Sequence, residues 1–191
     1  MLEQVIKFVN KSFEKCATGK SVAHFESTLH WIKELRPEAD EPILIAAYAH
    51  DIQRAFRETN TENTFKNIEL NDPDLLKHHQ QEGSKIICNF LESKGYDKKG
   101  IKRIGNMIAH HEEGGDEESD LIKDADSISY FYTNANKHVT ETVKTLGKEK
   151  IRNKIDWMYN RITSEKAKKI AKPKYLETVN KLKTFKTVML K

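Results

Sequence analysis

An unbroken apolar segment that leads directly into a histidine and an aspartate constrains this chain more than any other feature. The segment covers residues 42–49 and is followed by His50 and Asp51. A stretch that is apolar on every side is typical of a buried helix or strand. Asp40 as a cap and a proline in the first turn favour a helix over about 41–57. Buried imidazole and carboxylate groups need a partner or a metal ion. The segment therefore predicts either a closed His–Asp pair at a helix end or part of a metal site.

The rest of the chain shows the helical period and no convincing alternating strand. Apolar residues recur every three or four positions, and Gly, Pro, Asp and Asn interrupt this period. We therefore expect an all-α protein, a compact bundle of seven or eight helices in one domain spanning residues 1–191. The expected helices are about 2–17, 20–35, 41–57, 72–94, 97–113, 119–136, 138–163 and 174–189, with loops at 58–71 and 114–120.

Composition limits the classes of protein to which this chain can belong. Hydrophobic residues make up 37% and charged residues 32% of the sequence, which is typical of a soluble protein. The net charge of +4 is too small to indicate a nucleic-acid binder. Most of the basic excess follows residue 144, and we interpret it as solvated helix faces, with an anionic partner as the alternative. The two unpatterned cysteines and the short apolar runs favour a cytoplasmic protein that does not span a membrane.

Several further histidines and acids fall on or beside apolar helix faces. A lone histidine at such a position is more often a satisfied core residue than a ligand, but a helical core cannot easily bury this many imidazoles and carboxylates without a metal. Mixed nitrogen and carboxylate ligands suit Fe, Mn, Co, Ni or Zn. The inward polar set is His24, His50, Asp51, His79, His110 or His111, and Asp124 or Asp126.

The order of these residues resembles the HD-domain superfamily of metal-dependent phosphohydrolases over roughly residues 20–135. Local similarities are a histidine four residues before Gly83 and the Ala-Asp motif that ends at Asp126, which favours Asp126 over Asp124 as a ligand. The resemblance implies a metal held by four residues and a second metal bridged by Asp51, so one or two divalent transition metals are expected. The implied ligands are His24, His50, Asp51 and Asp126 for the first metal and His79 and His110 for the second, with His111 as a substitute or a hydrogen-bond partner.

The same resemblance implies hydrolysis of a nucleotide or other small phosphate ester by a metal-activated water. Asp51 and Arg54 are the expected catalytic residues, Arg54 as a cation for the phosphate. One alternative is a mixed-valent di-iron oxygenase of the same superfamily, because the same ligands serve both reactions. A second alternative is a non-catalytic regulatory or binding module with a structural metal. Helices at about 138–189 fall outside the resemblance and are expected to complete or cover the core. The substrate and any homo-oligomer stay open.

Overall fold

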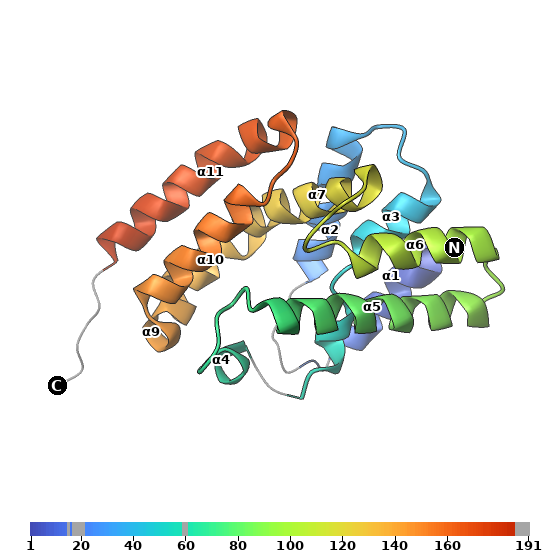
Figure 1. Cartoon of the computed structure of the whole chain (residues 1–191), viewed down its shortest axis with the longest axis horizontal. Helices are drawn as coiled ribbons and strands as arrows, with labels where there is room; N and C mark the ends of the chain where they lie inside the picture. The colour runs from blue at the N-terminus through green and yellow to red at the C-terminus, as the bar shows by residue number, and fades with distance from the viewer. Residues whose placement is uncertain (15, 17–21, 59–60, 186–191) are drawn as a thin grey trace.

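The computed structural model of the chain consists of helices and connecting turns (Figure 1). It describes residues 1–14, 16, 22–58 and 61–185, and no β-strand occurs within them, which confirms the all-α prediction. The elements are α1 (Leu2–Phe13), α2 (Val22–Leu35), α3 (Glu41–Ala49), the 3₁₀ turn η1 (Ile52–Phe56), α4 (Thr61–Thr64), α5 (Pro73–Ser93), α6 (Lys98–Ala109), α7 (Glu117–Thr133), α8 (Ala135–Lys137), the π-helical turn η2 (His138–Thr142), α9 (Val143–Leu146), α10 (Lys148–Asn160) and α11 (Glu165–Thr184).

The short helix α3 forms the centre of the N-terminal part of the molecule. Asp40 caps it, since its side chain accepts a hydrogen bond from the backbone N–H of Ile43 at 3.4 Å, and proline occupies the first turn. Helices α1, α2, α6 and α7 all pack against α3. This environment buries nearly every side of α3 and explains why its sequence is apolar throughout. The helix ends at Ala49, and the His50–Asp51 pair that follows it is buried inside the protein.

Two hydrophobic clusters form the core, and α7 contributes to both. The first cluster is built from α1, α2, α3, α5 and α6 together with Ile122 and Ala125 of α7. The second is built from α8 to α11 together with Ile128 and Phe131 of α7. Figure 1 shows α7, in yellow, between the blue-to-green N-terminal helices and the orange-to-red C-terminal helices. Residues of α7 are therefore positioned by both halves of the core.

The C-terminal helices differ from the expected pattern at two points. The long helix expected over about 138–163 is interrupted at Gly147, whose φ of 83° and ψ of 161° place it in a region that is essentially restricted to glycine. The last helix begins at Glu165 instead of about 174 and contains Pro173. Ser164 caps this helix by accepting a hydrogen bond from the N–H of Ala167 at 3.2 Å, so the capping serine, and not the proline, sets its start.

The N-terminal helices also end earlier than expected. The helix expected over about 2–17 ends at Phe13, and the start of the one expected at 20 falls on residues 17–21, which lie outside the described residues. The 41–57 helix is divided into α3 and the turn η1. The helix expected to reach 113 ends at Ala109 and continues as a turn. The early end of α6 matters most, because it places His110 and His111 in a turn instead of on the helix.

The expected loop at 58–71 is mostly irregular, but it is anchored to the C-terminal helices. Phe65 and Leu70 are buried in the second hydrophobic cluster. The ammonium group of Lys150 donates hydrogen bonds to the carbonyl oxygens of Phe65, Lys66 and Ile68 at 3.0, 3.2 and 2.9 Å. One lysine of α10 therefore fixes the path of this segment.

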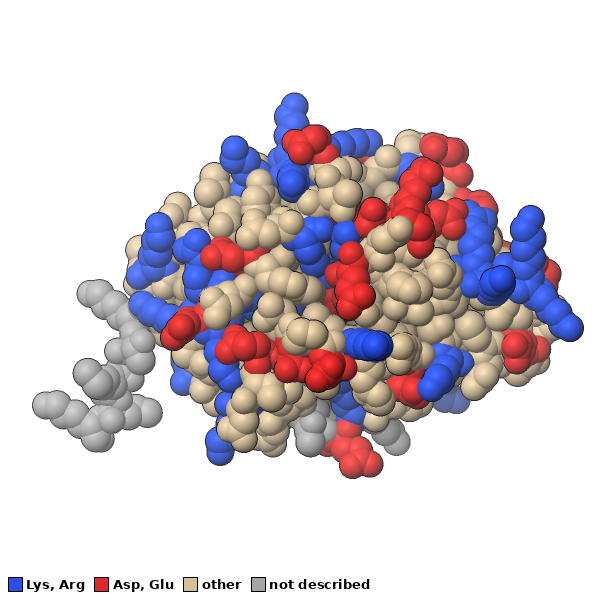
Figure 2. All heavy atoms as spheres, viewed as in Figure 1, with Lys and Arg blue, Asp and Glu red and all other residues tan. Residues whose placement is uncertain are grey.

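Basic and acidic side chains are interspersed on the molecular face shown in Figure 2. Among the described helices, none combines the length and the apolar character that a membrane crossing requires.

Candidate metal centre

The end of α3 places His50 and Asp51 where four other elements meet. His24 comes from α2, His79 from α5, and His111 with Glu112 from the turn after α6. These six side chains are buried, with exposed fractions of 4% or less. Asp126 of α7 completes the set at 7% exposed. Segments far apart in the sequence thus converge on one buried cluster of imidazoles and carboxylates.

The imidazole rings are held by hydrogen bonds at Nδ1. Nδ1 of His50 lies 2.8 Å from the carbonyl oxygen of Ala47, and Nδ1 of His111 lies 2.7 Å from that of Ile108. A carbonyl accepts only, so Nδ1 carries the proton and Nε2 keeps its lone pair in the neutral ring. Nδ1 of His79 lies 3.0 Å from Oε1 of Gln53, which favours the same tautomer. Such contacts on the far nitrogen are typical of histidines that bind a metal through Nε2.

Asp51 belongs to two groups of potential ligands. One group is His24, His50 and Asp51, and the other is Asp51, His79, His111 and Glu112. Within each group the candidate ligand atoms lie within 4.8 Å of one another. Oδ1 of Asp51 lies 2.8 Å from Nε2 of His79, whereas Oδ2 lies 3.8 Å from Nε2 of His24. The two oxygens of this carboxylate therefore face different histidines, which is the arrangement that a bridging ligand needs.

Asp126 joins the first of these groups. Its Oδ1 lies 2.9 Å from Nε2 of His24 and 3.4 Å from Nε2 of His50. Its other oxygen, Oδ2, accepts a hydrogen bond from the guanidinium of Arg161. Burial alone would raise the pKa of Asp126, but Arg161 and the hydrogen bond from His24 hold this pKa well below its usual range. Asp126 is therefore an anionic ligand candidate with one oxygen directed at the histidines.

Asp124, considered as an alternative to Asp126, contacts a different part of the protein. Its Oδ1 accepts a hydrogen bond from the backbone N–H of Thr163 at 2.7 Å, and its Oδ2 accepts one from Ser164 at 2.8 Å. Both carboxylate oxygens thus bind the turn that joins α10 to α11. Asp124 attaches the last helix to α7 and is not part of the cluster.

The structure also separates His110 from His111. His110 is exposed, and its Nδ1 lies 2.9 Å from the carbonyl oxygen of Asn106. His111 is completely buried, and its ring centroid lies 5.2 Å from those of both His50 and His79. His111, and not His110, therefore lies in the buried cluster, because α6 ends at Ala109 and both histidines follow in a turn.

Glu112 and Arg161 are members of the site that the sequence did not identify as such. Oε1 of Glu112 lies 3.7 Å from Nε2 of His111 and 4.0 Å from Nε2 of His79. Arg161 follows α10 and donates hydrogen bonds to both Glu112 and Asp126, and its Nε donates to Oγ of Ser127 at 2.8 Å. The basic residues after position 144 are expected mostly on solvated helix faces, yet the side chain of Arg161 is 6% exposed. The C-terminal helices thus contribute directly to the cluster.

Arg54, the expected phosphate-binding cation, lies beside the cluster. Its Nε is 2.5 Å from Oδ1 of Asp51, and one of its terminal nitrogens is 3.3 Å from Oε1 of Glu112. Its side chain is 15% exposed, so it is the partly accessible neighbour of the buried Asp51. Burial lowers the pKa of Arg54 from its usual value, but arginine remains charged in proteins.

Burial also keeps the neighbouring imidazoles neutral. The pKa of His111 is lowered to about 4, mainly by burial, and burial together with nearby Arg54 lowers that of His79. Burial would raise the pKa of Glu112, but Arg161 brings it below its usual range. Neutral imidazoles and ionised carboxylates are the protonation states that metal binding requires.

The donor set fits one or more transition-metal ions. Nε2 of His50 and Nε2 of His111 are buried and make no hydrogen bond to any residue that the structure describes. Buried polar atoms without partners are costly, and a cation between these nitrogens and Asp51 would satisfy them. Imidazole and carboxylate ligands together suit Fe, Mn, Co, Ni or Zn.

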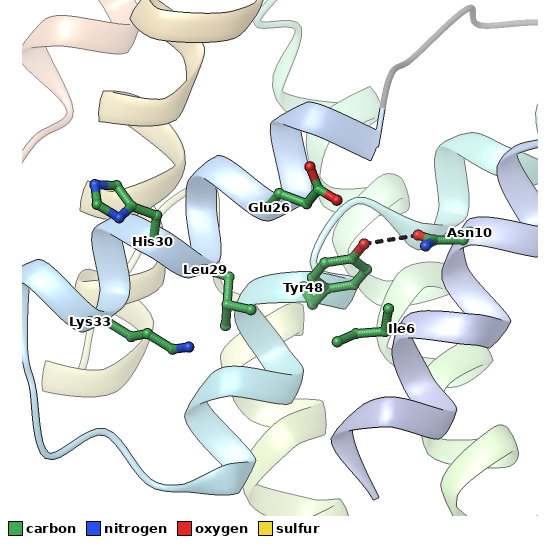
Figure 3. A pocket seen from close by; sticks show the side chains of 7 residues that line it. All are labelled: Ile6, Asn10, Glu26, Leu29, His30, Lys33 and Tyr48. Carbon is green, nitrogen blue, oxygen red and sulfur yellow. Dashed lines mark hydrogen bonds between the residues drawn. The ribbon is translucent and has the colours of Figure 1, made fainter.

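A surface pocket of about 320 Å³ lies between α1, α2 and α3 and includes none of the cluster residues. Figure 3 shows its lining, where the hydroxyl of Tyr48 donates a hydrogen bond to Oδ1 of Asn10 at 2.9 Å. The exposed side chains of Glu26, His30 and Lys33 also line it. The pocket is therefore a separate hollow and not an entrance formed by the cluster residues.

A solved structure with a similar fold is a crystal structure described as that of a predicted HD superfamily hydrolase from an uncultured Thermotogales bacterium. Its TM-score is 0.58 at 16% sequence identity, and the match covers 95% of this chain and 89% of that chain. At this identity the match shows the fold, which is therefore HD-like, as the sequence indicated. No curated protein matches the sequence. A family model described as "Domain of unknown function (DUF4202)" matches residues 8–183, so the chain belongs to the DUF4202 family.

Proposed function

We propose that this protein is a metal-dependent phosphohydrolase that acts on a nucleotide or another small phosphate ester at a dinuclear site. The observation that carries the proposal is the convergence of four buried imidazoles on Asp51, whose two oxygens face different histidines. The HD-like fold supports it, because the similar solved structure is described as a predicted hydrolase.

The ligand groups around Asp51 suggest how two metals would be held. His24, His50, Asp51 and Asp126 would hold the first, and Asp51, His79, His111 and Glu112 would hold the second. This assignment replaces His110 by His111 and adds Glu112. Asp51 would contribute to both groups.

A metal pair bound by these residues would lower the pKa of a bound water and would polarise the phosphoryl oxygens of a phosphate ester. The protein contributes orientation and charge. The carbonyl oxygens at Ala47 and Ile108 fix the rings of His50 and His111. Arg161 orients Asp126 and Glu112 by binding the oxygens that do not face the histidines. Arg54 is the partly exposed cation at the edge of the centre, and we assign it to the phosphoryl oxygens.

We also propose that the whole chain folds as one domain. Helix α7 belongs to both hydrophobic clusters, and Arg161 joins α10 to ligands of the N-terminal part. An HD-like core alone, without α10 and α11, would leave Asp126 and Glu112 without this cation.

The first test is metal content per chain, measured by mass spectrometry on protein purified without added metal or chelator. We expect about two transition-metal ions per chain, a loss for His111→Ala, and wild-type content for His110→Ala, the adjacent and exposed control. Hydrolysis of nucleotides and phosphate esters is then screened with Mn²⁺ or Co²⁺ in the absence of oxygen. A protein that binds no metal on titration would refute the proposal, and activity that requires both iron and O₂ would replace hydrolysis by oxygenation.

A further inference from the structure

The two ligand groups around Asp51 differ in how arginine binds their carboxylates. In the first group, Arg161 binds Oδ2 of Asp126. Oδ1 of the same carboxylate lies 2.9 Å from Nε2 of His24 and 3.4 Å from Nε2 of His50. The arginine and the histidines thus use opposite oxygens, so a metal ion beside the histidines would not compete with Arg161 for its oxygen.

In the second group, an arginine lies on the oxygens that face the histidines. Nε of Arg54 is 2.5 Å from Oδ1 of Asp51, the oxygen that lies 2.8 Å from Nε2 of His79. A terminal nitrogen of Arg54 is 3.3 Å from Oε1 of Glu112, the oxygen that lies 3.7 Å from Nε2 of His111. The guanidinium therefore joins the two carboxylates of this group through the oxygens that face the imidazoles.

Both oxygens of Glu112 are bound by arginines. Oε2 accepts a hydrogen bond from Arg161, and Oε1 accepts one from Arg54. A guanidinium remains charged in proteins, so neither contact is released by a change of protonation. A divalent ion at Oε1 would lie next to the charge of Arg54, in a buried region where like charges repel more strongly than in water. The second group therefore binds a metal ion only against competition from Arg54.

Arg54 can leave its position more easily than Arg161 can. The side chain of Arg54 is 15% exposed, whereas that of Arg161 is 6% exposed. Arg161 is also held by Oγ of Ser127 at 2.8 Å and by the ring of Trp157, whose centre lies 4.5 Å from its guanidinium carbon. Arg161 is thus a fixed part of the centre, and Arg54 is the arginine at its accessible edge.

We infer that Arg54 is an exchangeable cation of the second ligand group, and that it makes the metal ion of this group bind after, and more weakly than, that of the first group. A metal ion that binds there displaces the guanidinium, which is then available for the phosphoryl oxygens to which we assign it. The inference rests on the proposed function for the two metal ions. It adds the order in which they bind and the residue that sets this order.

The test is a calorimetric titration of the chelator-treated full chain with Zn²⁺, an ion that imidazole and carboxylate ligands suit. We expect two steps in the wild type, and we expect His111→Ala, which lacks a ligand of the second group, to lose the weaker step. Arg54→Gln should tighten the weaker step by roughly tenfold or more, the range of one charge-assisted hydrogen bond, and leave the tighter step unchanged. Arg54→Lys should keep the step weak, because it keeps the charge. Arg152→Gln, which removes a surface arginine paired with Asp156, is the matched control and should behave as the wild type.

A second measurement uses the wild-type protein and therefore decides the question if Arg54→Gln does not fold. The Nε–H signal of Arg54, identified by its loss in Arg54→Lys, is followed by NMR during the Zn²⁺ titration. It should keep its position during the first equivalent and shift during the second, because the hydrogen bond to Asp51 then breaks. A signal that does not move with the second equivalent would overturn the inference.

The outcomes separate this inference from the proposed function. Equal affinities for the second zinc in the wild type and Arg54→Gln would overturn the inference and leave the dinuclear hydrolase intact. If the wild type binds one zinc, a second zinc in Arg54→Gln supports the inference, and a single zinc in both overturns it. A wild type that binds none refutes the proposed function. Zinc uptake by Arg54→Gln would then still support the competition by Arg54, and no uptake by either protein would overturn it.

Discussion

Asp124 and Asp126 lie two residues apart on α7, and asparagine at each position should separate a structural carboxylate from a metal ligand. Asp124 accepts hydrogen bonds from two backbone amides of the α10–α11 turn at 2.7 and 2.8 Å. Asparagine keeps one acceptor and places an NH₂ group against the other amide. The loss of one buried charge-assisted hydrogen bond should lower the free energy of unfolding by about 1.5–3 kcal/mol.

For a chain of this length, that loss corresponds to a fall in Tm of roughly 3–12 °C. The metal content of Asp124→Asn should stay at the wild-type level, because neither oxygen of Asp124 faces the histidines. Asp126→Asn should lose metal, since Oδ1 of Asp126 lies 2.9 Å from Nε2 of His24. It also weakens the contact with Arg161, so a lower Tm alone does not distinguish the two variants.

The decisive assay is therefore the rise in Tm on metal addition, measured by calorimetry together with metal content per chain. A ligand that binds only the folded state raises Tm. Asp124→Asn should show the wild-type rise from a lower starting Tm, whereas Asp126→Asn should show little rise. The reasoning fails if Asp124→Asn loses its metal response while its metal-free Tm stays at the wild-type value.

Three further predictions concern the C-terminal helices. Gly147→Ala should lower the free energy of unfolding by about 1–3 kcal/mol in urea denaturation because of the backbone angles at this position, whereas Lys148→Ala should change it little. Lys150→Met should increase hydrogen exchange at residues 65–68, which lose their ammonium donor, with metal content unchanged. Burial lowers the pKa of Lys154 from 10.5 to about 7, so the unfolded chain binds the extra proton between these values. Stability of the chelator-treated protein should therefore rise with pH in that window, by at most about 1.4 kcal/mol per unit, and Lys154→Met should lack this rise.

The start of several helices was predictable because the signals that set it are local. Asp40 and Asp72 each precede a proline and accept a hydrogen bond from an amide three residues later. The end of a helix depends more on tertiary contacts. Pro173 does not interrupt α11, because Ala167 and Ala171 bury one face of the helix and Ser164 caps it. These contributions offset the hydrogen bond that the proline removes.

Helical periodicity could not choose between neighbouring candidates for the site. His110 and His111 lie beyond the last residue of α6, where the angular spacing of a helix no longer applies. Asp124 and Asp126 lie within a run of α7, residues 122–131, that is buried on every side. A helix without a solvated face gives no pattern that separates inward from outward positions. The family motif favoured Asp126, but the partners of both carboxylates come from elements distant in sequence.

The basic residues after position 144 show most clearly what composition cannot reveal. A lysine or arginine on a charged helix is normally solvated, and Lys148 conforms to that expectation. Lys154 and Arg161 occur on the same helix or just after it, yet both are buried beside the cluster. Asp126 and Glu112 each turn one oxygen to Arg161, so the orientation of two proposed ligands depends on a helix outside the recognised motif. Residues that orient the proposed metal ligands should therefore be sought at the end of α10 as well as in the His and Asp motifs.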